Sequence, residues 1–212
     1  MKRISWRRGM RLTDDLLRAS DDCNIDVIGM VAMMASAGRF GLLPSDKPFE
    51  VSLNFGKGCI DIDSLSCRAI SRNGTLIDVD FSTRFDNNFA TRIEIPEIPG
   101  VEEFLLVVEA ISGQWKSTHD GFEEPVYTFS LISADSVVPD NGVPVAHIVD
   151  DYGWRMDEID FVPPCLFVTS HPKYNELLHK FGDLLSNMDV KARAAVGSAA
   201  NGAIAVFWPI VQ

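Results

Sequence analysis

Short runs of alternating apolar and polar residues follow one another between residues 49 and 149, separated by glycine, proline and asparagine. Alternation of this kind predicts strands with one face on a core and the other face in solvent. Many short strands at regular spacing indicate a sandwich or a barrel. The predicted strands cover residues 49–55, 59–62, 65–70, 76–81, 91–95, 104–108, 126–132 and 143–149.

Local signals place the turns between these strands. Asn73-Gly74 predicts a β-hairpin with a type I′ turn, because both residues tolerate a positive φ. Gly56-Lys-Gly58 indicates a second turn, and residues 113–121 are predicted as a polar loop. The run Phe104-Leu-Leu-Val-Val108 is apolar throughout, which favours a central strand buried on both faces.

A helix is predicted at about residues 13–37. Thr13 is a capping residue, and Asp14 and Asp15 place acids in the first turn. We expect two helical pieces with a break near Asp21-Asp22, and an end before Gly38. The apolar face is predicted to consist of Leu16, Leu17, Ile25, Ile28, Val31 and Ala32.

The predicted strands give way to predicted helices between residues 157 and 172. Pro163 and Pro164 cannot donate to a β ladder and are excluded from a helix interior, so they predict a rigid, extended connector. Residues 166–169 are short and apolar enough for a buried strand. Ser170 as a capping hydroxyl and Pro172 in the first turn then predict the start of a helix.

Two helices are predicted after the connector, forming a hairpin. Residues 173–189 carry apolar side chains at steps of three and four, as in the seam of a helical bundle. Residues 190–207 are rich in alanine, which allows close packing, and the apolar end at 207–212 is expected to be covered by the body or a partner. The stripe of the first helix comprises Tyr174, Leu177, Leu178, Phe181, Leu184, Leu185 and Met188.

These elements predict a mainly β chain. We expect a β-sandwich or barrel-like domain over residues 1–170, with a helical insertion at about 13–37, followed by a helical hairpin at 171–212.

Composition excludes some classes of protein. The net charge of −11 argues against a nucleic-acid binder, which needs a basic face for phosphates. The four cysteines form no CxxC pair, which favours buried thiols in a reducing compartment. Residues 29–37 are apolar but too short to span a bilayer, and no signal peptide is recognised. We therefore expect a cytoplasmic protein without direct membrane insertion.

Candidate chemistry is sparse. His119-Asp120 lacks an accompanying nucleophile, and a surface loop is the favoured interpretation. His171 and His179 are a weak metal pair, because His171 precedes a proline. The pairs Asp61/Asp63 and Asp78/Asp80 fit the solvent face of a sheet better than a cation site. We expect no catalytic residue, no metal and no cofactor.

Exposed aromatic residues are a second kind of candidate. They could line a sugar-binding face, although scattered aromatics more often pack in cores or loops. The residues concerned are Trp115, Phe122, Tyr127, Tyr152 and Trp154.

The first twelve residues form a basic segment that we call the arm. Lys2, Arg3, Arg7, Arg8 and Arg11 are mixed with alternating apolar residues, which indicates an extended arm or an edge strand. A positive arm on a negative body suits docking on an acidic neighbour, including another copy of the chain; a solvated terminus is the alternative. The predicted docking residues are Trp6, Arg7, Met10 and Leu12.

Several segments, in order, resemble the TssK baseplate family of type VI secretion. The opening Trp6-Arg-Arg-Gly-Met-Arg-Leu12 resembles W-x-x-G-M-x-L, and Ser71-Arg-Asn-Gly-Thr-Leu-Ile-Asp78 resembles a P-D-G-T-x-F-D hairpin. Asp160-Phe-Val-Pro-Pro-Cys-Leu166, followed by Ser170-His-Pro172, resembles the closing motif D-x-x-F-[IV]-P-P-C-L and S-P. The motif residues are Phe161, Pro163, Pro164 and Leu166.

The resemblance covers about residues 1–185 and implies a β-sandwich "shoulder", akin to that of siphophage receptor-binding proteins, followed by a helical neck. It implies a homotrimeric structural adaptor that contacts wedge proteins of the baseplate. The helical stripe is then an oligomerisation surface, formed by Leu177, Leu178, Phe181, Leu184, Leu185 and Met188.

This chain departs from the family in two places. Thr13-Asp-Asp-Leu-Leu17 stands where the family has P-Q-H-F-Q. Family members also continue beyond the neck into a C-terminal domain that binds the membrane complex, and no counterpart is expected in a sequence that ends at Gln212. A phage-tail receptor-binding module that grips a glycan, located in a virion or tail particle, and an unrecognised enzyme are the alternative functions.

Overall fold

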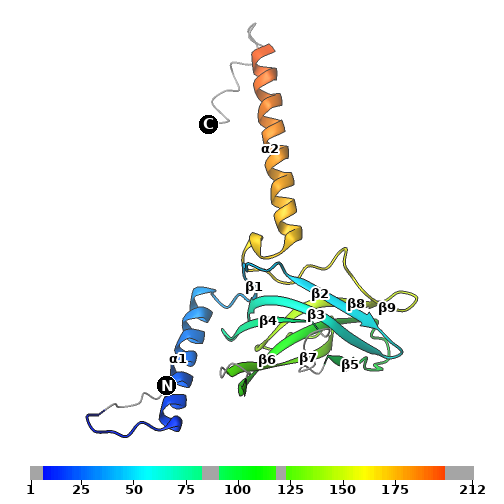
Figure 1. Cartoon of the computed structure of the whole chain (residues 1–212). Coiled ribbons are helices and arrows are strands. Elements are labelled where there is room, and N and C mark those ends of the chain that lie inside the picture. Colours follow the sequence, from blue (N-terminus) through cyan, green and yellow to red (C-terminus); the bar gives the residue numbers. More distant parts are fainter. Residues whose placement is uncertain (1–6, 83–90, 118–122, 199–212) are drawn as a thin grey trace. The chain divides into compact units, whose positions relative to one another are not determined.

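The computed structural model describes residues 7–82, 91–117 and 123–198. The chain divides into two compact units, Met1–His171 and Pro172–Gln212. Within the first unit the described residues are mainly strand, arranged as two antiparallel sheets that follow one N-terminal helix (Figure 1). The described part of the second unit, residues 172–198, is one helix. The mainly β prediction, with helices at both ends, is confirmed.

The first sheet is organised around one long strand, β3 (Cys59–Ile70). Strand β3 pairs along one edge with β2 (Glu50–Phe55) and, at its end, with the two-residue β1 (Gly41–Leu42). Along the other edge it pairs with β4 (Leu76–Ser82) and with the short β5 (Arg92–Glu94). The first sheet therefore has five strands, four of which pair only with β3.

The second sheet has four strands in the order β7-β6-β8-β9. Residues 104–108, predicted as a central strand, lie in β6, between β7 and β8. The predicted polar loop at 113–121 is wrong for its first part, because β6 continues to Ser117 after a shift in register beyond Ala110. The bounds are β6 (Glu103–Ser117), β7 (Glu123–Ser133), β8 (Gly142–Asp150) and β9 (Trp154–Met156).

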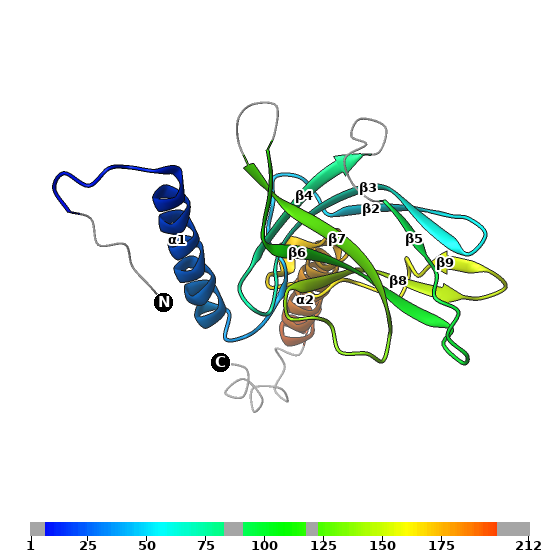
Figure 2. The same cartoon turned by 90° about the horizontal axis from the view of Figure 1, so that it is seen from below.

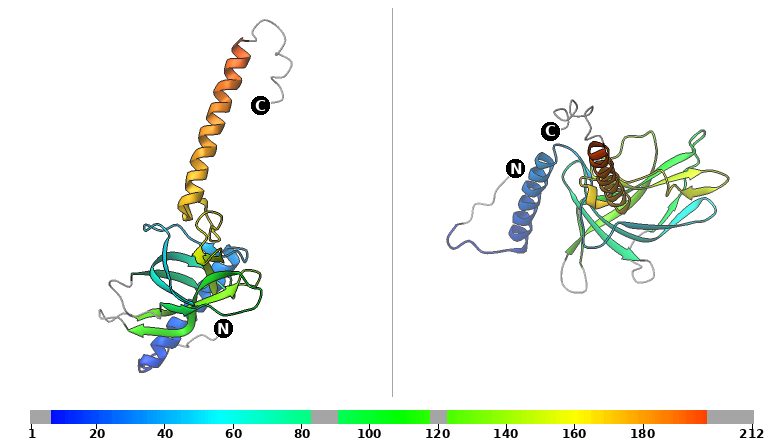
Figure 3. Two further views of the ribbon diagram at one scale, coloured as in Figure 1. Left: turned by 90° about the vertical axis from the view of Figure 1, so that its right-hand side faces the viewer. Right: turned by 90° about the horizontal axis from the view of Figure 1, so that it is seen from above.

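The core lies between the two sheets, which face each other in Figures 2 and 3. Ile60, Ile62 and Leu65 of β3 contribute from one sheet, and Phe104 and Ile148 contribute from the other, each at most 1% exposed. Every second side chain of these strands enters the core, which explains the alternation of apolar and polar residues in the sequence.

The hairpin between β3 and β4 lies where it was predicted, but its turn is different. Ile70 pairs with Leu76, so five residues connect the strands, and only Gly74 has a positive φ (+85°). The type I′ turn is therefore wrong. Ser71 closes the turn with a backbone donation to Thr75 and accepts from Gly74. A side chain at Gly74 would also meet the carbonyl oxygen of Gly29, in the N-terminal helix, at 2.1 Å.

The N-terminal helix α1 (Asp14–Ala35) is continuous, so the predicted break near Asp21-Asp22 is wrong. Both aspartates are exposed, and an exposed aspartate in a helix costs only a few tenths of a kcal/mol. The predicted cap is confirmed, because the Oγ1 atom of Thr13 accepts from the backbone of Leu16 at 3.4 Å. The helix ends before Gly38, as expected.

The connector after β9 contains no strand at residues 166–169, so that prediction is wrong. Cys165 forms a single parallel bridge with Leu42, and a 3₁₀ turn, η1 (Val168–Ser170), follows. Phe167 and Val168 are about half exposed, and the two-residue β1 offers their backbone no pairing partner. Ser170 lies within this turn and not in a capping position, whereas Pro172 is the first helical residue, as predicted.

Helix α2 (Pro172–Ser198) fills the described part of the second unit, where a hairpin with a break after residue 189 was predicted. The predicted break at 189–190 is wrong, because no glycine or proline interrupts the helix there and Asp189 accepts a hydrogen bond from Arg193 one turn later, at 2.8 Å. The rest of the predicted second helix, residues 199–207, lies outside the described residues.

Replacement of Gly41 tests the fit between β1 and the connector. A Cβ atom there would lie 2.3 Å from the carbonyl oxygen of Pro164, and φ is +136°. We expect Gly41→Ala to lower the free energy of unfolding by at least about 2 kcal/mol, since a positive φ alone costs roughly 1–2 kcal/mol. Gly100→Ala is the control, because Gly100 has a φ of +80° with open space around it. Equal losses for the two variants in urea unfolding would contradict the steric argument.

Candidate interaction surfaces

Helix α2 carries an apolar stripe that none of the described residues covers. The six side chains predicted for oligomerisation are between 45% and 65% exposed. They lie one and two turns apart, so they share one face of the helix. Isolated helices are marginal in water and gain most of their stability from packing of an apolar face. The stripe therefore has the properties of an interface. Its members are Leu177, Leu178, Phe181, Leu184, Leu185 and Met188.

The arm is exposed as far as the structure describes it. Arg7, Met10 and Leu12 are all solvent-accessible, and the backbone of Met10 donates to Arg7 in a turn. The predicted edge strand is therefore wrong for residues 7–12. Trp6 lies outside the described residues. The docking role of the arm remains a prediction.

The connector motif fastens the end of the sandwich to β1. The backbone of Leu42 donates to Pro164 at 2.7 Å and accepts from Leu166 at 3.0 Å. Pro163 accepts from the Cys165 thiol at 3.2 Å, and the ring of Phe161 packs against His147 at 5.7 Å. These residues thus have a structural role directly before α2. We call the Leu42 pairing with residues 164–166 the clasp.

His147 of β8 holds the start of the connector. Its side chain is 17% exposed and lies between two carboxylates, with Nδ1 3.2 Å from Asp157 and Nε2 3.3 Å from Glu103. Asp157 also accepts from the backbone of Asp160 at 3.0 Å and of Ile159 at 3.3 Å. The hydrogen bond from Asp160, followed by that from His147, lowers the pKa of Asp157 below its ordinary value.

The four cysteines form no disulfide with one another. Burial raises the pKa of Cys67 to about 12, with smaller contributions from Asp78 and Cys165. Burial also raises the pKa of Cys165 to about 11. Since the thiolate is the reactive form, both thiols are chemically inert at neutral pH.

The weak candidates for chemistry are dispersed. His119-Asp120 and Phe122 lie outside the described residues. His171 is buried against the ring of Phe49 at 5.3 Å, whereas His179 is exposed on α2. Within the described ranges no three residues among His, Cys, Asp and Glu are grouped so that they could hold a metal.

The paired aspartates mostly face basic side chains on the sheet surface. Asp78 lies 3.3 Å from Arg68, Asp61 lies 3.9 Å from Arg92, and Asp80 contacts Lys47. These contacts agree with the solvent face that the sequence favoured for both aspartate pairs.

The aromatic candidates serve different purposes. The hydroxyl of Tyr127 bonds to the backbone of Asp78 at 3.2 Å, and Trp154 packs on Phe104 at 5.4 Å. Trp115 is 41% exposed, and Tyr152 is fully exposed at a turn with a φ of +58°. Trp154 and Tyr127 are therefore accounted for by packing and hydrogen bonding within the sandwich.

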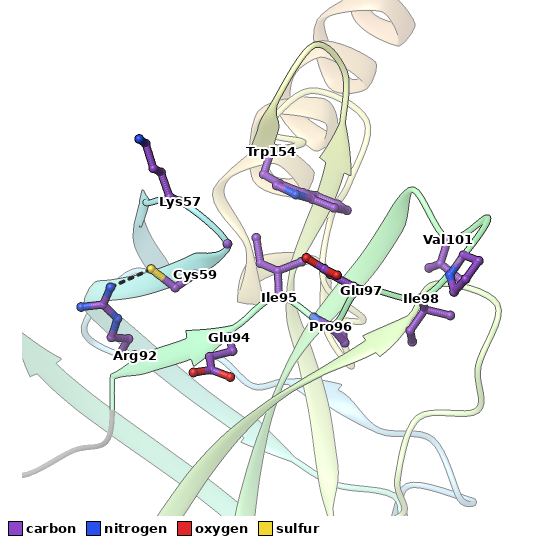
Figure 4. Close-up of a pocket in the computed structure, with 12 residues that line it drawn as sticks. Lys57, Cys59, Arg92, Glu94, Ile95, Pro96, Glu97, Ile98, Val101 and Trp154 are labelled. Carbon is purple, nitrogen blue, oxygen red and sulfur yellow. Dashed lines mark hydrogen bonds between the residues drawn. The ribbon is translucent and has the colours of Figure 1, made fainter.

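One concave site was missed by the sequence analysis: an open groove of about 980 Å³ beside β5. Lys57 and Arg92 stand at one end, Ile98 and Val101 at the other, and Ile95 and Trp154 lie between them (Figure 4). The guanidinium of Arg92 donates a hydrogen bond to the Cys59 thiol at 3.0 Å. This hydrogen bond, together with the nearby charge of Asp61, raises the pKa of Arg92 above its ordinary value. The sequence did contain one signal for this site, the segment Glu94-Ile-Pro-Glu-Ile-Pro99. Its two prolines cannot continue a β ladder, so they indicate that the strand ends there.

Solved structures with the same arrangement come from type VI secretion baseplates. The chain matches a structure of the baseplate complex (TM-score 0.56, 16% identity, 98% of this chain and 73% of that chain). It matches the TssK-TssF-TssG baseplate subcomplex (0.57, 17%, 98% and 74%) and TssK from T6SS EAEC bound to nanobody nb18 (0.54, 18%, 88% and 67%). The chain has the TssK fold. In a crystal structure of TssK it spans 51% of that chain, with a TM-score of 0.61.

The TssK resemblance noted in the sequence thus extends to the fold over nearly the whole chain. No family model and no curated sequence matches it. Among the described helices, none combines the length and hydropathy that crossing a bilayer would require.

Asp157 predicts how stability depends on pH. Its pKa is lowered in the folded state, so its contribution is complete above the ordinary value of 3.8 and is lost as the pH falls through the folded value. We expect Asp157→Asn to lower the free energy of unfolding at pH 7 by about 1–3 kcal/mol. The difference in free energy of unfolding between this variant and the unmodified chain should become smaller as the pH of the urea titrations is lowered toward 3.

The matched control is Asp160→Asn, which makes the same change three residues away at an exposed side chain. It should alter the free energy of unfolding by less than about 0.5 kcal/mol. A gap for Asp157→Asn that stays constant between pH 7 and pH 3 would show that its carboxylate charge is not responsible.

Proposed function

We propose that this chain is a non-enzymatic structural adaptor of a type VI secretion-like, contractile injection baseplate, which assembles as a homotrimer and contacts wedge proteins. The observation that carries the proposal is the exposed stripe of α2, in a chain that also contains a TssK-fold sandwich. The fold supports a baseplate role because each matched structure is a baseplate assembly or TssK itself.

The stripe supports self-association through the second unit. Spacings of three and four residues between Leu177, Phe181, Leu184 and Met188 match the seam of a helical bundle. Identical helices in a closed cyclic assembly bring the same face of each copy to a common axis. Three copies of α2 would thereby cover the six apolar side chains that one copy leaves in water.

The sandwich and the arm are the surfaces proposed for other baseplate proteins. One matched structure is a complex of TssK with TssF and TssG, so partners of that kind are the proposed wedge contacts. The arm residues Trp6, Arg7, Met10 and Leu12 remain the proposed docking element. The net charge of −11 supports protein partners over nucleic acid. Four cysteines that form no disulfide support a cytoplasmic, baseplate-associated location.

Acidic substitutions in the stripe test the trimer. We expect the chain to have a mass of about 70 kDa by light scattering, three times its 23.4 kDa. The double variant Leu178→Asp/Leu185→Asp should be monomeric, because burying unpaired carboxylates at the bundle axis is strongly unfavourable.

The control is His179→Asp/Ser186→Asp, which places two acids at the same spacing on the other side of α2. Both positions are exposed, and this variant should remain trimeric. A trimer that survives the Leu178/Leu185 changes would overturn the assignment of α2 as the assembly element. A monomeric unmodified chain would overturn the trimer itself.

A further inference from the structure

The groove beside β5 borders an open strand edge. The backbone of Ile95 donates to Gly58, and that of Ile62 donates to Thr91, so Thr91 and Ile95 direct these backbone groups toward β3. Because successive residues alternate, the N–H and C=O groups of Arg92 and Glu94 point to the opposite edge. No strand among the described residues pairs with that edge. A short extended segment could therefore pair there.

The groove combines an apolar surface with charges of both signs, because Lys57 and Arg92 line it at one end and Glu94 and Glu97 also contribute to its lining. Ile98 is 47% exposed, and Ile95, Val101 and Trp154 continue the apolar surface beside it. Glu94 and Glu97 line the groove. Asp150, which donates its backbone N–H to Glu102, brings the turn at Asp150-Asp151 next to the groove segment. Arg155 is already paired with Asp151 at 3.2 Å.

The arm is the part of this chain whose chemistry fits such a groove. It carries five of the 19 Lys and Arg residues and no acid, so the other 200 residues have a net charge of −16 against a total of −11. In an extended conformation Ile4 and Trp6 project to one side, and Arg3, Ser5 and Arg7 project to the other. A short segment with two large apolar side chains and basic neighbours matches a three-residue strand edge beside an apolar groove that also presents Glu94 and Glu97.

We infer that the groove of one copy receives residues 2–6 of a neighbouring copy, as a short strand added to β5. The backbone of the arm pairs with that of Arg92 and Glu94, while Ile4 and Trp6 contact Ile98, Val101 and Trp154. The side chain of Arg92 is directed to Cys59 and Asp61. The basic side chains of the arm lie toward Glu94 and Glu97. This inference rests on the proposed self-assembly, which supplies the neighbouring arm.

Photocrosslinking of the full chain tests the inference. Trp6 is replaced by benzoylphenylalanine, the protein is irradiated, and crosslinked peptides are mapped by mass spectrometry. We expect crosslinks into residues 94–101 or Trp154. A crosslink between copies runs at twice 23.4 kDa on a denaturing gel, whereas one within a copy does not.

Two substitutions in the photoreactive chain show whether the groove holds the arm. Ile98→Asp should reduce the crosslink yield at least ~tenfold, equivalent to about 1.4 kcal/mol of binding. Val137→Asp, at a side chain that is 82% exposed outside the groove, should leave the yield unchanged. Ile98 is in a loop and half exposed, so this variant is expected to fold, which circular dichroism checks.

The remaining outcomes separate the inference from the proposed function. A trimer by light scattering whose crosslinks map elsewhere, stay within one copy or do not form overturns the inference alone. A crosslink yield that is unchanged by Ile98→Asp also overturns the inference. So does a groove that forms crosslinks only with a basic segment of another baseplate protein. A monomer without crosslinks between copies overturns both.

Discussion

Two backbone hydrogen bonds hold together the parts of the first unit that lie farthest apart in sequence. In the clasp, Leu42 both donates to and accepts from residues 164–166, so the beginning and the end of the sandwich meet at one residue that is 1% exposed. Gly41 permits this approach because any side chain there would meet Pro164. His147 and Phe161 then fix the preceding residues of the connector. The sandwich is thus closed directly before α2 begins.

The sequence predicted the elements whose side chains follow a simple period. The longer strands of both sheets, the hairpin at Gly74, the Thr13 cap and the helical start at Pro172 all follow from local patterns, whereas the short strands β1 and β9 were not predicted. Errors arose where the neighbours of a segment decide its structure. Residues 166–169 are apolar enough for a strand but have no partner beyond β1, and β6 continues through polar residues because backbone pairing with β7 suffices.

The candidate surfaces divide in the same way. The stripe of α2 could be predicted from the sequence because helical spacing alone defines it. The structure adds that its residues are exposed in one chain. The groove could not be predicted from the sequence, because only the fold brings its lining together. That lining comes from β3, from β5, from the segment between β5 and β6, and from β9. The role of the Phe-Val-Pro-Pro-Cys-Leu motif was also hidden, since its partner Leu42 lies more than 100 residues earlier.

The prolines that follow β5 have a consequence for solubility. An unpaired strand edge is a template for aggregation, and natural proteins keep such edges short or interrupt them. Strand β5 has three residues, and Pro96 and Pro99 cannot extend its ladder. This edge can accept a few residues of another chain, but it offers too little backbone to start a growing cross-β stack. The strand edge of β5 can therefore stay open in solution without acting as a template for polymerisation.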